Sequence, residues 1–101
     1  MTVAELHAAG NGLFKVTGPV VFATAGELLE TSRELFAAAA SLRVDLSGVT
    51  EVDSAALALL IEWSRQAHQQ HRTIRIEHTP EKLMAIARLT GTGDIIAMTG
   101  D

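Results

Sequence analysis

No cysteine occurs among the 101 residues. This absence excludes disulfides, thiolate metal sites and cysteine nucleophiles, and it favours a reducing compartment. Basic residues are also few. The eight lysines and arginines are scattered without a run, and the formal net charge is −4. Because nucleic-acid binding depends on a clustered basic surface, we expect no nucleic-acid partner.

Targeting and membrane-spanning signals are missing as well. Residues 1–7 show no basic region followed by an apolar stretch, so no signal peptide is predicted. No apolar run reaches the roughly 18 residues that a membrane-spanning helix needs. We therefore expect a cytoplasmic protein without direct membrane insertion.

The composition that remains is that of a soluble globular protein. Apolar residues make up 48% of the chain and charged residues 20%, and no repeat, linker or low-complexity segment interrupts it. A chain of this length builds one hydrophobic core. The sequence predicts a single domain over residues 1–101.

The N-terminal third predicts two strands and a helix. Residues 3–22 read as strands that are broken at Gly10-Asn11-Gly12, a strong hairpin signal, and again at Gly18-Pro19. Thr24 and Glu27 have the spacing of a capping box, which predicts a helix that begins at Thr24. Apolar residues then recur at intervals of three and four, as on one face of a surface helix.

The remaining two thirds alternate strand and helix. We expect a strand over 43–46, a polar turn over 47–51, a helix from about 54 to 68 and a strand over 73–77. A third helix is predicted to open at Thr79-Pro80-Glu81 and to end at Gly91. Residues 95–98 form either a last strand or a segment that covers the core. This order predicts the α/β class: a mixed sheet with an opening antiparallel hairpin and then parallel βα units, flanked by helices.

The start of the second predicted helix is the sharpest candidate site. Asp53 and Ser54 place a carboxylate and a hydroxyl at the helix N-terminus, where backbone N–H groups lack intrahelical partners. Asp and Ser are also the residues that helix starts prefer, so a simple cap explains them equally well. The hydroxyl suits either contact with a partner or phosphorylation.

The body of this helix is apolar around most of its circumference. Its predicted buried stripe consists of Leu57, Leu60, Ile61 and Ser64. Small or apolar residues also lie outside that stripe, namely Ala55, Ala56, Ala58, Leu59 and Trp63. Such a helix is either buried on both sides or meets a partner with its outer face, and in a chain this small we expect a docking face.

Catalytic and metal sites find little support in the pattern. A serine nucleophile needs a base within hydrogen-bond reach, and neither His7 nor His78 lies on an element expected to meet Ser54. His68 and His71 are three residues apart but have no further ligands nearby. We expect no enzymatic activity, no metal and no cofactor.

With these elements in place, the chain resembles the STAS domains, a family named for sulfate transporters and anti-sigma factor antagonists. The resemblance rests on the order of elements and on the segment Val44-Asp-Leu-Ser-Gly-Val-Thr-Glu-Val-Asp-Ser54, and Leu89-Thr-Gly91 also fits. The family implies a small mixed sheet with helices, no catalysis, and action through docking to a partner.

Two branches of the family compete. Anti-sigma factor antagonists carry Asp-Ser-Ser-Gly-Leu at this helix start, and a sigma-regulatory kinase phosphorylates the serine. Here Ser54 matches the first hydroxyl, whereas Ala55 and Ala56 replace the second serine and the glycine. The STAS subunits of Mla-type phospholipid ABC transporters resemble Val52-Asp-Ser-Ala-Ala-Leu-Ala-Leu-Leu60 closely, and Glu62-Trp63 is also similar.

The second branch implies an accessory subunit that binds the transporter ATPase on the cytoplasmic side of the inner membrane. By this resemblance Ser54 belongs to the contact and Asp53 caps the helix. The expected partner-binding residues are Asp53, Ser54, Ala55, Ala58, Leu59, Glu62 and Trp63. The first branch leaves Ser54 as a phosphoacceptor, and this alternative stays open.

Overall fold

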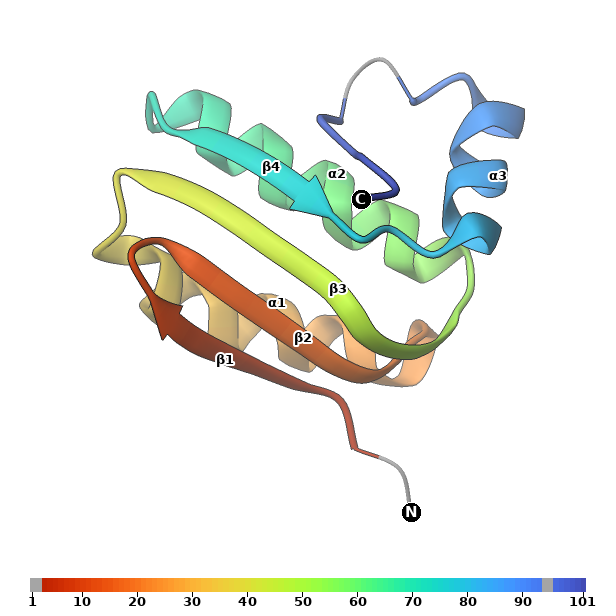
Figure 1. The fold of residues 1–101 in the computed structure, drawn as a ribbon, viewed down its shortest axis with the longest axis horizontal. Helices are drawn as coiled ribbons and strands as arrows, with labels where there is room; N and C mark the ends of the chain where they lie inside the picture. Colours follow the sequence, from red (N-terminus) through yellow and green to blue (C-terminus); the bar gives the residue numbers. More distant parts are fainter. Residues whose placement is uncertain (1–2, 94–95) are drawn as a thin grey trace.

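The computed structural model describes residues 3–93 and 96–101. Strands and helices alternate as the sequence predicts (Figure 1). Their bounds along the chain are β1 (Glu5–Gly10), β2 (Leu13–Val20), α1 (Phe22–Ala37), β3 (Ser41–Val52), α2 (Ser54–Gln69), β4 (Thr73–Glu77) and α3 (Glu81–Thr90).

The strands form one mixed sheet in the order β1-β2-β3-β4. The hairpin of β1 and β2 is antiparallel, and β3 and β4 each add in parallel. Asn11 and Gly12 both have positive φ, at 54° and 77°, which is the backbone of a two-residue hairpin turn. The predicted hairpin and the predicted mixed sheet are both confirmed.

Two breaks expected in the strands are wrong. The predicted turn at residues 47–51 is part of β3, and β2 runs through Gly18-Pro19 with only a shift of register. The late part of β2 pairs with the late part of β3, with Gly18 opposite Val49 and Val20 opposite Val52. Proline is tolerated there because β1 pairs with β2 only as far as Thr17, so the backbone nitrogen of Pro19 faces no antiparallel neighbour.

Helix α1 begins earlier than predicted, with Val21 as the N-cap and Thr24 inside its first turn. The hydroxyl of Thr24 still caps the helix. Its Oγ1 accepts a hydrogen bond from the Val21 backbone N–H at 3.0 Å and lies 2.7 Å from the Pro19 carbonyl oxygen, to which it donates. The predicted capping box of Thr24 and Glu27 is therefore wrong, although Thr24 accepts a capping hydrogen bond from within the first turn.

The other helix ends follow the sequence more closely. Helix α2 starts at Ser54 behind Asp53, as predicted, and α3 ends at Gly91, which has a φ of 73°. The N-cap of α3 is Pro80, one residue later than the predicted Thr79, whose side chain is buried. The last predicted segment pairs with β4 at Met98, whereas Ile95 lies outside the described residues.

Helices α1 and α2 cover the same face of the sheet, behind the strands in Figure 1. Both crossovers step in the same direction across the sheet, so right-handed connections place both helices on one side. Between the layers lies the core, whose largest fully buried side chains include Trp63, Leu60, Ile76 and Leu83. The described residues contain no helix with both the length and the apolar character to cross a membrane.

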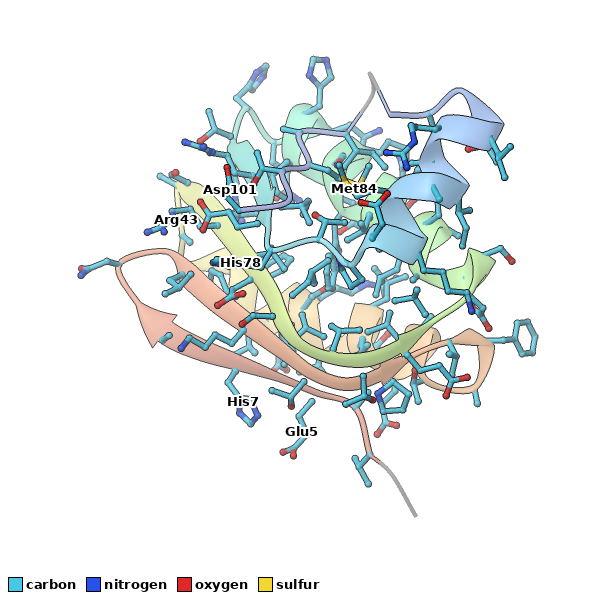
Figure 2. The ribbon with its side chains drawn as sticks, turned by 45° about the vertical axis from the view of Figure 1, so that its right-hand side comes forward. Glu5, His7, Arg43, His78, Met84 and Asp101 are labelled. Atoms are coloured by element: carbon cyan, nitrogen blue, oxygen red, sulfur yellow. The ribbon has the colours of Figure 1, made fainter. Side chains whose placement is uncertain are left out.

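Polar side chains line the opposite face of the sheet. Glu5 and His7 project outward from β1 (Figure 2), and Nε2 of His7 lies 3.7 Å from Oε2 of Glu5. Across the sheet, Arg43 of β3 forms an ion pair with Glu77 of β4 at 3.0 Å. A solvated face of this kind leaves the helical layer as the place to search for an apolar docking surface.

Candidate functional site

Asp53 joins the N-termini of two helices. Its Oδ1 accepts a hydrogen bond from the backbone N–H of Ala55 at 2.8 Å, which caps α2 as the sequence predicts. Its Oδ2 accepts from the backbone N–H of Phe22, the first residue of α1, at 3.1 Å. A single carboxylate therefore satisfies free N–H groups of both helices, where negative charge is favoured.

A groove opens between the N-terminal halves of α1 and α2 with a volume of about 540 Å³. Ser54 and Ala58 stand exposed on its α2 side, and Ala55 is half-buried beside them. We call this surface the α1–α2 groove. Its lining residues are Phe22, Ala25, Gly26, Leu29, Asp53, Ser54, Ala55, Ala58, Leu59 and Glu62.

The expectation for Trp63 is wrong. Its side chain is 1% exposed, packs edge-on against Phe36 at 5.3 Å between ring centroids, and donates from Nε1 to Ser32 Oγ at 2.8 Å. Trp63 is a core residue that locks α2 to α1, so it offers no surface to a partner. The reason is that α2 packs against both α1 and α3, which buries two flanks of the helix.

Leu59 is also more buried than the sequence predicted, with 4% of its surface exposed. It forms part of the lining of the α1–α2 groove. Among the predicted partner-binding residues, the structure therefore brings Asp53, Ser54, Ala55, Ala58 and Glu62 to the same groove. Whether they contact a partner stays a prediction.

Glu62 carries the negative charge at the far end of the groove from Asp53. Hydrogen bonds from Arg65, and a further one from Gln66, lower the pKa of the Glu62 carboxyl to about 2. Its side chain remains 31% exposed. The carboxylate is therefore ionised at neutral pH and accessible at the edge of the groove.

Sequence reasoning missed the wall contributed by α1. Phe22 is 88% exposed, and Ala25, Gly26 and Leu29 continue the same side of α1 along the groove. Two local signals point to this wall: an aromatic residue outside the apolar stripe, and a lone glycine within a helical pattern. The expected helix start at Thr24 hid the first of these signals by placing Phe22 in a strand.

The histidines lie away from the groove. His7 belongs to the polar face of the sheet, and His78 follows β4, where its backbone N–H donates to the Asp101 carbonyl oxygen at 2.8 Å (Figure 2). Neither residue lines the groove beside Ser54. Across residues 3–93 and 96–101, no group of three or more potential ligands could hold a metal ion.

Comparisons of sequence identify relatives. A family model described as "Mlab, STAS domain" matches residues 4–98. The Haemophilus influenzae protein named intermembrane phospholipid transport system binding protein MlaB is 34% identical over 53 residues, which cover 52% of this chain and 50% of that protein. The chain therefore aligns with about half the length of this curated relative.

Comparisons of structure find the same fold at low identity. The unphosphorylated anti-sigma factor antagonist SpoIIAA superposes with a TM-score of 0.72 and 12% identity, covering 96% of this chain and 86% of that chain. A sulfate transporter family protein from Wolinella succinogenes gives 0.70 and 12%, covering 93% and 81%. At these identities the likeness concerns the fold alone.

Proposed function

Because this chain belongs to the STAS-domain family described for MlaB, we propose that it is a non-catalytic accessory subunit of an Mla-type phospholipid ABC transporter. In this role it binds the cytoplasmic ATPase subunit and stabilises or activates it, and so helps to maintain the lipid asymmetry of the outer membrane. It is held at the inner membrane through the transporter complex and not by its own insertion.

The α1–α2 groove is the observation that carries this proposal. It combines an apolar floor with an exposed serine at the position that the family resemblance assigns to the contact. Apolar concave surfaces with a few polar groups at the edge are typical of protein-binding sites. The family match and the name of the Haemophilus influenzae relative support a partner in phospholipid transport.

Binding of the purified ATPase subunit of the same transporter tests the proposal. Ala58→Arg places a long charged side chain over an exposed position of the groove, and we expect it to abolish co-purification while the domain remains folded. Ala40→Arg adds the same side chain at an exposed position outside the groove and serves as the matched control. Unchanged binding by Ala58→Arg, or no binding by the wild type, contradicts the proposal.

The second candidate is an anti-sigma factor antagonist that a kinase regulates at Ser54. The exposure of Ser54 at the first position of α2 favours it, since the hydroxyl is open to modification. A phosphate there would lie next to the Asp53 carboxylate and repel it. Intact mass of the protein purified from its native host tests this candidate, and uniformly unmodified protein argues against it.

A further inference from the structure

We infer that the α1–α2 groove receives an amphipathic helix of the partner protein, with its apolar stripe in the groove and basic side chains beside Asp53 and Glu62. This inference rests on the proposed docking function and specifies the chemistry of the partner. It is drawn from the exposure of Phe22, the space at Gly26 and the sign of the charges in the groove.

Phe22 supplies an anchor on the α1 side. Only three large hydrophobic side chains are exposed within the described residues, namely Val3, Phe22 and Leu89, and Phe22 alone lines the groove. Its backbone is held by Asp53 while its ring remains 88% exposed. An aromatic ring on a fixed backbone is typical of the residues that contribute most to protein–protein binding.

Gly26 leaves room for a close approach. It lies inside α1, where glycine destabilises a helix relative to alanine. A Cβ atom at this position would meet nothing within 4 Å, so no contact within the described residues requires a glycine. Ala55 and Ala58 stand on the opposite wall. Small residues on both walls allow the backbone of a third element to come close.

The walls of the groove favour a helix as the occupant. Both are helices whose side chains form ridges, and a third helix packs by placing its own ridge between them. None of the lining residues belongs to a strand, so no sheet edge borders the groove to pair with an added strand.

The charges in the groove favour basic side chains on that helix. Asp53 and Glu62 are the titratable residues of the lining, and both are carboxylates. They lie about 13 Å apart along α2, from the rise of an α-helix. Arg65 pairs with Glu62 at 2.5 Å from outside the lining, and the positive charge of Arg33 on α1 also acts on this carboxylate, so the two cations offset part of its charge. The partner helix should therefore carry two lysine or arginine residues about two and a half turns apart beside its apolar stripe.

The affinity of the purified ATPase subunit for single variants tests these features separately. We expect Phe22→Ser to weaken binding at least about tenfold, and Gly26→Leu to weaken it at least as strongly by filling the groove. Leu89→Ser is the matched control for Phe22→Ser, because Leu89 is 87% exposed but lies on α3. Binding that is insensitive to both groove variants overturns the inference.

Charge is tested with Glu62→Gln and with salt. We expect this variant to weaken binding by about three- to tenfold and to reduce its dependence on sodium chloride. Glu34→Gln, an exposed substitution on α1 outside the groove, should leave the affinity and its salt dependence unchanged. Tighter binding by Glu62→Gln, or no salt dependence in the wild type, overturns the assignment of a basic partner.

Photo-crosslinking from position 22 identifies the occupant. With p-benzoylphenylalanine in place of Phe22, we expect mass spectrometry to find a crosslink to a helix of the ATPase subunit that has lysine or arginine beside apolar residues. A crosslink to a loop, an acidic segment, a lipid or a second copy of this chain overturns the inference. If the complex with the ATPase subunit forms but the crosslink is of one of these other kinds, the proposed function stands and only the inference on the partner helix is wrong. If no complex forms, the proposed function and the inference are both wrong.

Discussion

The two ends of the interface between α1 and α2 differ sharply. At the C-terminal end Trp63 fills the space between the helices, donates to Ser32 and stacks edge-on against Phe36. Arg72 reaches back from the loop after α2 and donates to the Phe36 and Ala37 carbonyl oxygens at the end of α1. The hollow that remains there is about 140 Å³, against about 540 Å³ for the α1–α2 groove.

At the N-terminal end the same two helices present small residues and an exposed ring. Asp53 holds the helix ends together through backbone N–H groups, so the side chains along the groove are not needed to close it. The comparison indicates a division of work along one helix pair. We expect the closed end to supply stability and the open end to serve recognition. Substitutions at the two ends should therefore have separable effects.

Trp63→Ala should have the largest effect on stability. It removes a ring that is 1% exposed and leaves a cavity, which should lower the free energy of unfolding by about 3–5 kcal/mol. Urea denaturation measures the loss. Trp63→Phe keeps most of the ring and loses the hydrogen bond to Ser32, so its cost should be smaller. A Trp63→Ala variant as stable as the wild type would contradict the conclusion that the C-terminal end of the α1–α2 interface supplies stability.

Arg72→Ala should lower the free energy of unfolding by about 1–2 kcal/mol, because it removes the cation that satisfies two carbonyl groups at the end of α1. Thermal denaturation measures this change. Affinity for the ATPase subunit should stay unchanged, since Arg72 does not line the groove. Loss of binding by the folded variant would show that the two ends are coupled.

Asp53→Ala should affect both properties. Loss of the cap on α2 costs about 1 kcal/mol of stability, and loss of the hydrogen bond to Phe22 frees the start of α1. We expect weaker binding of the ATPase subunit in addition. Asp53→Asn retains an acceptor for the cap and should lie between the wild type and Asp53→Ala in calorimetric stability. Equal stability of all three proteins would contradict a capping role.

Substitution of Glu62 should give the smallest effect on stability, and one that is present near neutral pH and disappears in acid. Its folded pKa of about 2 lies below the ordinary 4.5, so its contribution is present above pH 4.5 and is lost as the pH falls towards 2. Because the side chain is partly exposed, solvent screens the interaction. Unfolding midpoints of Glu62→Gln against the wild type, measured above and below pH 4, should converge in acid. A difference between the two unfolding midpoints that stays the same at every pH would contradict the lowered pKa of Glu62.

Local signals explain which parts of the fold could be predicted. The Asn11-Gly12 turn, the Asp53 cap and the Gly91 helix end depend on a few adjacent residues, and all three are confirmed. The polar stretch over 47–51 is predicted as a turn but forms part of β3. The prediction was wrong because the pairing of this stretch with β2 depends on residues about 30 positions away. Sequence periodicity contains no information on such a partner.

The candidate site was predicted in part for the same reason. Ser54 and Ala58 follow from the pattern of α2 alone, whereas Trp63 was misplaced because its burial depends on Ser32 and Phe36 of another helix. The contribution of Phe22 also depends on the side-by-side arrangement of two helix N-termini, which the Asp53 carboxylate links. The exposure of a residue was therefore easier to predict when it depends on its own helix alone than when it depends on a second helix packed against it.

The shared carboxylate of Asp53 has a consequence for the speed and cost of association. Since its hydrogen bonds link the starts of the two helices that form the walls of the groove, little conformational entropy should be lost from this chain upon binding. The free and bound backbones should then superpose closely, as in pre-organised complexes. Association should be limited by encounter and orientation, with no slow rearrangement of this chain beforehand.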